Sequence, residues 1–111
     1  MLTLDKLREF GADVDEGLMR CMNKEDFYLG LVNRILGDKR LDQLGQQIEA
    51  KDFSAAFETA HALKGVFSNL SLTPLTLPVI EITELLRSGT DTDYTALINE
   101  AKAQYSRLCS L

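Results

Sequence analysis

The chain has 111 residues, of which 45% are hydrophobic and 26% are charged, and its formal net charge at pH 7 is -5. These values predict one globular domain, residues 1–111, that is long enough to bury a hydrophobic core without disulfides. The negative charge argues against a nucleic-acid partner, because nucleic acids bind to basic surfaces.

The predicted elements are all helices, because apolar residues recur at spacings of three and four along the chain. Residues 4–22 predict one or two short helices that are broken near Gly11. A further helix is expected after Asn23, which would act as its N-cap, with Asp26 three residues later. Its buried stripe is expected to consist of residues one turn apart, namely Phe27, Leu31 and Ile35.

Gly37 and Asp38 are expected to end that helix and to cap the next. Leu41, Leu44 and Ile48 predict the buried stripe of this next helix. Lys51 and Asp52 mark another break, after which residues 53–70 form a central helix.

Another helix is predicted from about Pro74 or Pro78 to Arg87, because Pro78 is unusual inside a helix and could delay its start. Ser88 and Gly89 give its stop signal. The last helix is expected from about residue 93, and the residues that share one side of it are Leu97, Ala101, Tyr105 and Leu108.

Short connections force consecutive helices to run antiparallel as neighbours. The fold class predicted is therefore all-α, an antiparallel up-and-down four-helix bundle with additional short N-terminal helices. No run of 18 apolar residues occurs, which excludes a membrane-spanning helix. Residues 1–8 lack the pattern of a signal peptide, and the two cysteines match no metal or secreted framework, so we expect a cytoplasmic protein.

His61 is the only histidine of the chain. On the helical wheel of residues 53–70 it lies roughly 120° from the centre of the apolar arc, which places it at or beyond the boundary with solvent. The arc itself consists of Phe53, Ala56, Ala60, Leu63, Phe67 and Leu70. The side chains that share the wheel sector of His61, or lie between it and the core, are those of Ser54, Phe57, Lys64, Gly65 and Ser68. A glycine inside a helix costs about 1 kcal/mol relative to alanine, and close approach of another molecule would compensate for that cost.

The segment from Ala60 to Gly65, Ala-His-Ala-Leu-Lys-Gly, closely resembles the signature of histidine-containing phosphotransfer (HPt) domains. In that signature an alanine and a histidine are followed by any residue, leucine, lysine and glycine on a bundle helix. The resemblance extends to residues 17–18 with 26–29, to residues 51–53 and to residues 87–89. Two departures stand out. Ser71 stands where the family commonly has a glycine, ten residues after the histidine, so the turn there must be made differently. Thr83 stands near a position where the family tends to have an acidic residue.

The resemblance implies a phosphoryl relay, in which His61 accepts a phosphoryl group from an aspartyl phosphate on one receiver domain and passes it to the aspartate of another. Lys64 would neutralise charge on the phosphoryl group. We expect Phe57, Lys64, Gly65 and Ser68 to form the centre of the surface that binds the partner. The chain would be a carrier and not an enzyme, since it has no ATP-binding motif.

The expected partners are the receiver domains of hybrid histidine kinases and of response regulators. The partner receiver would supply Mg²⁺, so we expect this chain to bind no metal and no cofactor. We expect a monomer, and the initial methionine with a near-complete bundle favours a free-standing protein.

Two alternatives stay open on sequence alone. One is a helical adaptor that binds a receiver or a kinase through the same face without phosphorylation. The other is a metal or catalytic site built on His61 and Glu58, which are one helical turn apart. That alternative has no second histidine and no clustered cysteines to support it.

Overall fold

The computed structural model describes all residues, 1–111, and it contains helices and no strands. The seven helices are α1 (Leu4–Phe10), α2 (Val14–Arg20), α3 (Glu25–Ile35), α4 (Arg40–Glu49), α5 (Phe53–Asn69), α6 (Thr73–Arg87) and α7 (Thr95–Cys109). The prediction of an all-α fold is confirmed, and the N-terminal segment forms two short helices that are separated at Gly11, as expected.

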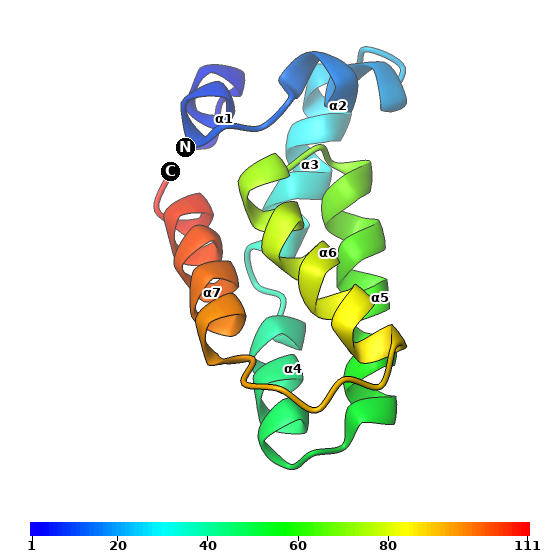
Figure 1. Cartoon of the computed structure of the whole chain (residues 1–111). Coiled ribbons are helices and arrows are strands. Elements are labelled where there is room, and N and C mark those ends of the chain that lie inside the picture. Colours follow the sequence, from blue (N-terminus) through cyan, green and yellow to red (C-terminus); the bar gives the residue numbers. More distant parts are fainter.

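Helices α4 to α7 form an antiparallel up-and-down bundle (Figure 1). Helix α5 packs against α4 and α6, and α7 packs against α6 and also contacts α4, which closes the ring of neighbours. Helices α1 and α2 lie across the upper end of the bundle, and α3 leads down from there toward α4 (Figure 1). All seven helices contribute side chains to one hydrophobic cluster of 24 buried residues.

Tyr28 on α3 ties the N-terminal helices to the end of α5. Its side chain is fully buried, and its hydroxyl donates a hydrogen bond of 2.7 Å to the Leu70 carbonyl oxygen. Burial raises the pKa of Tyr28 to about 12. Gly17 on α2 makes room for the phenol ring, because a Cβ at this position would lie 2.6 Å from ring atoms of Tyr28. The position of α5 relative to α2 and α3 therefore depends on this contact.

The predicted start of α3 is wrong, and of its predicted buried stripe only Ile35 is buried. The N-cap is Lys24, and Asn23 adopts a left-handed backbone conformation with φ of 57° in the turn that precedes the helix. Phe27 is half exposed, and the buried residues of α3 are Tyr28, Val32 and Ile35. The apolar residues of this short segment fit two neighbouring stripes equally well. The space beside Gly17 selects the stripe that contains Tyr28.

Helix α6 begins at Thr73, so Pro78 does not delay its start. Proline lacks an N–H and removes one hydrogen bond in the second turn, but its side chain is buried against the bundle. The helix ends at Arg87 with Ser88 as its C-cap, and Gly89 has a φ of 66°, as the stop signal predicts. Helix α7 begins at Thr95, two residues later than expected.

Candidate functional site

Helix α5 holds every residue that the sequence singled out for function. The Asp52 side chain caps its N-terminus by accepting a hydrogen bond from the Ala55 N–H (3.3 Å). Its buried face consists of Ala56, Ala60, Leu63 and Phe67, which agrees with the wheel. His61 lies in the middle of the helix and is exposed. The buried residues span about three turns of α5, and their packing against the core fixes the backbone that carries the imidazole.

The imidazole of His61 stacks on the ring of Phe57, one turn earlier on α5. The two ring centroids are 5.8 Å apart and the planes differ by 21°. Phe57 is half-buried at the boundary between α5 and α6. The Arg87 guanidinium of α6 lies over the Phe57 ring, with its Cζ atom 5.1 Å from the centroid. Phe57 thus contacts both the histidine and an arginine cation.

Lys64 lies one turn after His61 on α5, and its side chain is half-buried. Its Nζ atom is 3.9 Å from Oε1 of Glu84 on α6. The other carboxylate oxygen of Glu84 accepts a hydrogen bond from Nε of Arg87 at 3.2 Å. One carboxylate is therefore shared by two cations beside the histidine.

Gly65 and Ser68 differ in how accessible they are. A Cβ added at Gly65 would have no heavy atom within 4 Å, so the helix surface there is open. Ser68 is half-buried, and its carbonyl oxygen accepts a hydrogen bond of 2.7 Å from Nη1 of Arg20 on α2. Arg20 is in turn paired with Glu16 at 2.6 Å. Helix α2 therefore borders the C-terminal side of the site.

A shallow cavity of about 510 Å³ lies between the first half of α5 and the last turn of α6. Phe57 and Arg87 are among the residues that line it, so it adjoins the histidine. Nearer the start of α6, Leu77 and Ile80 are exposed apolar side chains, and Leu77 lines a groove between α6 and α7. The surroundings of His61 combine an open helix surface, two cations and the half-buried ring of Phe57, as expected for a contact with a macromolecule.

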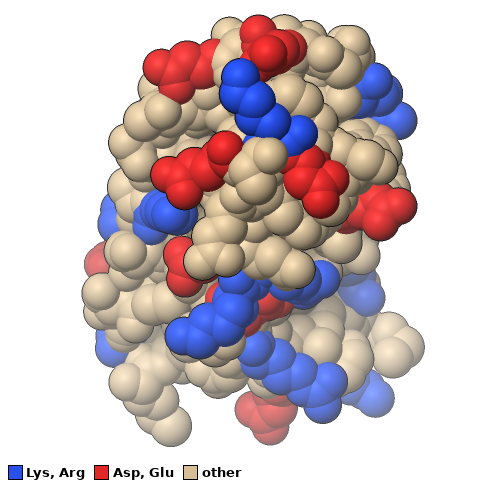
Figure 2. All heavy atoms as spheres, turned by 90° about the horizontal axis from the view of Figure 1, so that it is seen from below, with Lys and Arg blue, Asp and Glu red and all other residues tan.

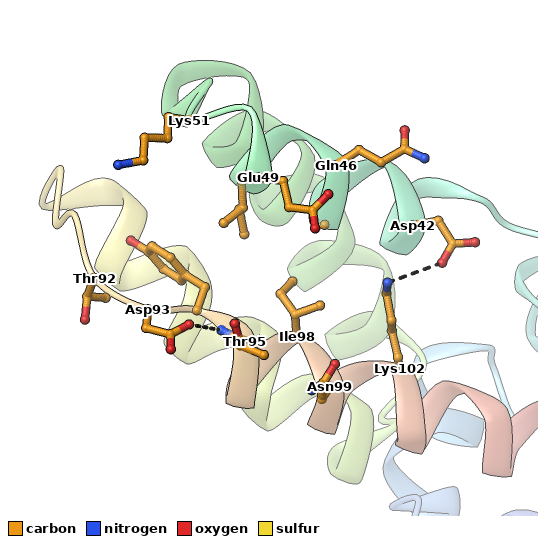
Figure 3. Close-up of a pocket in the computed structure, with 13 residues that line it drawn as sticks. Asp42, Gln46, Glu49, Lys51, Thr92, Asp93, Thr95, Ile98, Asn99 and Lys102 are labelled. Atoms are coloured by element: carbon orange, nitrogen blue, oxygen red, sulfur yellow. Dashed lines mark hydrogen bonds and ion pairs between the residues drawn. The ribbon is translucent and has the colours of Figure 1, made fainter.

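A second cavity of about 510 Å³ lies between α4 and α7, and His61 is not part of its lining. Figure 3 shows the charged side chains that surround it, including the Lys102–Asp42 pair at 3.9 Å and the hydrogen bond from the Thr95 N–H to Asp93. Its walls carry both signs of charge, so neither an anion nor a cation is clearly favoured there.

Seen from the lower end of the bundle, the surface carries both acidic and basic side chains, and several basic side chains lie next to one another in the lower half of the view (Figure 2). The chain has no cluster of three or more His, Cys, Asp and Glu side chains that could hold a metal ion. Glu58 and His61 therefore have no third ligand of these types. No helix combines the length and the apolar character that a membrane span needs.

The two departures from the family pattern lie away from the imidazole. Ser71 adopts a left-handed backbone conformation, with φ of 56°, in the buried turn after α5. Its hydroxyl oxygen is buried without a hydrogen-bond partner. Thr83 is fully buried, and its hydroxyl donates to the Val79 carbonyl oxygen (2.7 Å). Position 83 therefore faces the core, and the acidic side chain on the surface beside it is Glu84.

Sequence reasoning did not identify three residues that contact the site, namely Arg20, Glu84 and Arg87. Glu84 and Arg87 are three residues apart on one helix, and this spacing is a signal for an ion pair on a shared face. Arg20 lies 48 residues from its partner Ser68. No local pattern predicts a contact over that distance.

The family model described as Hpt domain matches residues 36–110, which include α4 to α7 and the whole of the predicted site. No curated protein and no solved structure matches the chain.

Proposed function

The chain belongs to the histidine-containing phosphotransfer (Hpt) domain family, and on this premise we propose that it relays a phosphoryl group between the aspartates of receiver domains in a multistep phosphorelay. Domains of this family are phosphocarrier modules of two-component signalling, and they interact with receiver domains. Their defining chemistry is histidine phosphotransfer. The relay between two receivers, and the residues that carry it, are the proposal.

The observation that supports the proposal best is the exposure of His61 on a rigid helix. The imidazole stands on the open surface of α5 and in neither of the two larger cavities. A neutral imidazole is a competent nucleophile near pH 7. A group that must meet the phosphorylated aspartate of another protein has to project from the surface. This placement suits a carrier and does not suit a small-molecule enzyme, which would surround its substrate.

In the proposed step, the unprotonated ring nitrogen of His61 attacks the phosphorus of the receiver's aspartyl phosphate. A P–N bond forms, the P–O bond to the aspartate breaks, and the aspartate leaves as a carboxylate. The imidazolium then gives its ring proton to water. Transfer to a second receiver runs the same bond changes in reverse. Such a transfer depends mainly on positioning and on charge neutralisation, and Lys64 would contribute to the latter.

The partner supplies the rest of the chemistry in this proposal. The receiver brings the Mg²⁺ ion, while this chain brings the nucleophile and the docking surface around Phe57, Lys64, Gly65 and Ser68. The open helix surface at Gly65 supports this assignment, because an approaching helix or loop would meet no side chain there. We further propose that residues 1–111 act as one unit, since α1 to α3 share the core of the matched bundle. We also propose that this unit is a monomer and acts in the cytoplasm.

The test is phosphoryl transfer in solution. The purified chain is mixed with a receiver domain that has been phosphorylated in the presence of Mg²⁺, and the phosphate bound to each protein is measured over time. We expect acid-labile, base-stable phosphate on this chain, followed by its transfer to a second, unphosphorylated receiver. Binding of the receiver without any covalent phosphate would favour the adaptor alternative and overturn the relay.

A further inference from the structure

Glu84 holds two cations beside the proposed phosphoacceptor. Its carboxylate lies 3.9 Å from the Lys64 ammonium and 3.2 Å from Nε of Arg87. The side chain of Glu84 is 54% exposed and that of Arg87 is 49% exposed. Ion pairs as exposed as these are weak and exchange readily. Glu84 therefore positions the two cations, but each of them can exchange Glu84 for another anion.

The two cations are related to the imidazole in different ways. Lys64 is one helical turn from His61 on α5. Arg87 lies over the Phe57 ring at 5.1 Å, and the same ring stacks on His61 at 5.8 Å. The cation–π contact holds the guanidinium against the Phe57 ring without using its remaining N–H donors. A new anion on His61 would thus find one cation along α5 and one across Phe57.

The charge balance changes when His61 carries a phosphoryl group. In the unphosphorylated protein, one carboxylate faces two cations. A phosphoryl group adds about 1.5 to 2 negative charges near pH 7 and three strong acceptor oxygens. Arginine and lysine bind phosphate oxygens strongly, so the phosphoryl group competes with Glu84 for both of them.

We propose that Glu84 is a positioning residue that holds Lys64 and Arg87 in the unphosphorylated protein and releases them to the phosphoryl group on His61. This inference rests on the proposed function of His61. Because the phosphoryl group must displace Glu84 from both cations, Glu84 opposes phosphorylation and favours onward transfer. The carboxylate therefore sets the equilibrium between phosphohistidine and the receiver's aspartyl phosphate.

The test replaces Glu84 by glutamine, which keeps the shape of the side chain and removes the charge. The equilibrium constant for phosphoryl transfer from a phosphorylated receiver to His61 is measured, together with the rate of return to the unphosphorylated receiver. From the free energies that exposed ion pairs contribute, we expect the equilibrium constant to shift toward phosphohistidine by about two- to fivefold. The return rate should fall, because the phosphoryl group keeps both cations.

Two variants provide matched controls. Glu81→Gln makes the same chemical change one turn earlier on α6, where the carboxylate has no ion pair. Glu58→Gln removes an exposed carboxylate three residues before His61 on α5, also without an ion pair. Both variants test whether the loss of any negative charge near His61 is enough to shift the phosphotransfer equilibrium. We expect each of them to change the equilibrium much less than Glu84→Gln does.

A double-mutant cycle separates competition for the cations from simple repulsion. Glu84→Gln is repeated in a chain that also carries Lys64→Ala and Arg87→Ala, where its effect on the equilibrium should disappear. An unchanged effect in that background, or an effect equal to that of the two controls, would overturn the role of Glu84. Absence of phosphate from every variant and from the unmodified chain would instead contradict the proposed function itself.

Discussion

Replacement of Gly65 by glutamine should make the protein more stable and less able to bind its receiver. Gly65 lies inside α5, where a glycine is disfavoured by about 1 kcal/mol relative to alanine. A Cβ at this position has no heavy atom within 4 Å, so a larger side chain meets no obstacle in the free protein. Glutamine is a good helix former, and we expect a gain of about 0.5 kcal/mol in the free energy of unfolding. For a domain of this size the melting temperature should rise by about 2–4 °C.

The unfavourable effect of Gly65→Gln, a loss of affinity for the receiver, appears only in the complex. Interface cores pack as densely as protein interiors, and extra atoms forced into such packing cost about 1–3 kcal/mol. This cost corresponds to roughly a 5- to 150-fold increase in the receiver's Kd. The rate of phosphoryl transfer at low receiver concentration should fall by a similar factor, because fewer encounters reach the productive geometry.

Gly30 on α3 provides the matched control. It is also inside a helix, and a Cβ there also meets nothing within 4 Å. Gly30→Gln should raise the melting temperature by a similar amount and leave binding unchanged. Thermal unfolding by circular dichroism and titration of the receiver by calorimetry measure both quantities. If Gly65→Gln is stabilised and binds its receiver with normal affinity, Gly65 is not part of the docking surface and the reasoning fails.

Three further predictions concern other parts of the site and its support. Lys64→Ala should slow phosphorylation or shorten the lifetime of the phosphohistidine without abolishing transfer. If both quantities are unchanged, Lys64 is only a solvated residue at the boundary of the core and has no role in transfer. Tyr28→Phe should lower the free energy of unfolding by about 1–3 kcal/mol, because the buried Leu70 carbonyl loses its phenolic donor. Burial in the folded state raises the pKa of Tyr28 to about 12 from its ordinary value of 10.0, so the stabilisation by the neutral phenol is complete below pH 10 and is lost as the pH rises toward 12. The difference between the variant and the wild type in denaturant unfolding should therefore narrow over that range, and a constant difference would contradict the burial of the phenol. Ser71→Gly should stabilise the protein by about 1 kcal/mol, because it removes a left-handed serine and a buried hydroxyl without a partner. A lower melting temperature for this last variant would show that the turn does not strain the serine.

The sequence predicts what one helix determines by itself. The buried face of α5, the break before it at Lys51 and Asp52, and the exposure of His61 follow from residue types and spacing alone, and the structure agrees with all three. The capping of α5 by the Asp52 side chain was found only in the structure. Helices of strong periodicity and clear stop signals, such as α6 with Gly89, are also predictable. The family signature lies within one such helix, which explains why it can be recognised without a structure.

Features that join two helices were not predictable in the same way. The shared carboxylate of Glu84 depends on how far α6 is rotated toward α5, and core packing decides that rotation. The choice of Tyr28 over Phe27 for the core of α3 depends on the space that Gly17 leaves on another helix. The contact between Arg20 and Ser68 likewise depends on where α2 crosses the bundle.

The most direct test of the account is the replacement of His61, the single imidazole of the chain, by glutamine. The His61 side chain is exposed, and its ring stacks on Phe57, which is itself only half-buried. Helicity and thermal stability of the variant should therefore stay nearly unchanged. After incubation with a phosphorylated receiver and Mg²⁺, His61→Gln should carry no acid-labile, base-stable phosphate, whereas the wild type should carry it. Phosphate retained on a folded His61→Gln protein would contradict the central claim that His61 is the phosphoacceptor.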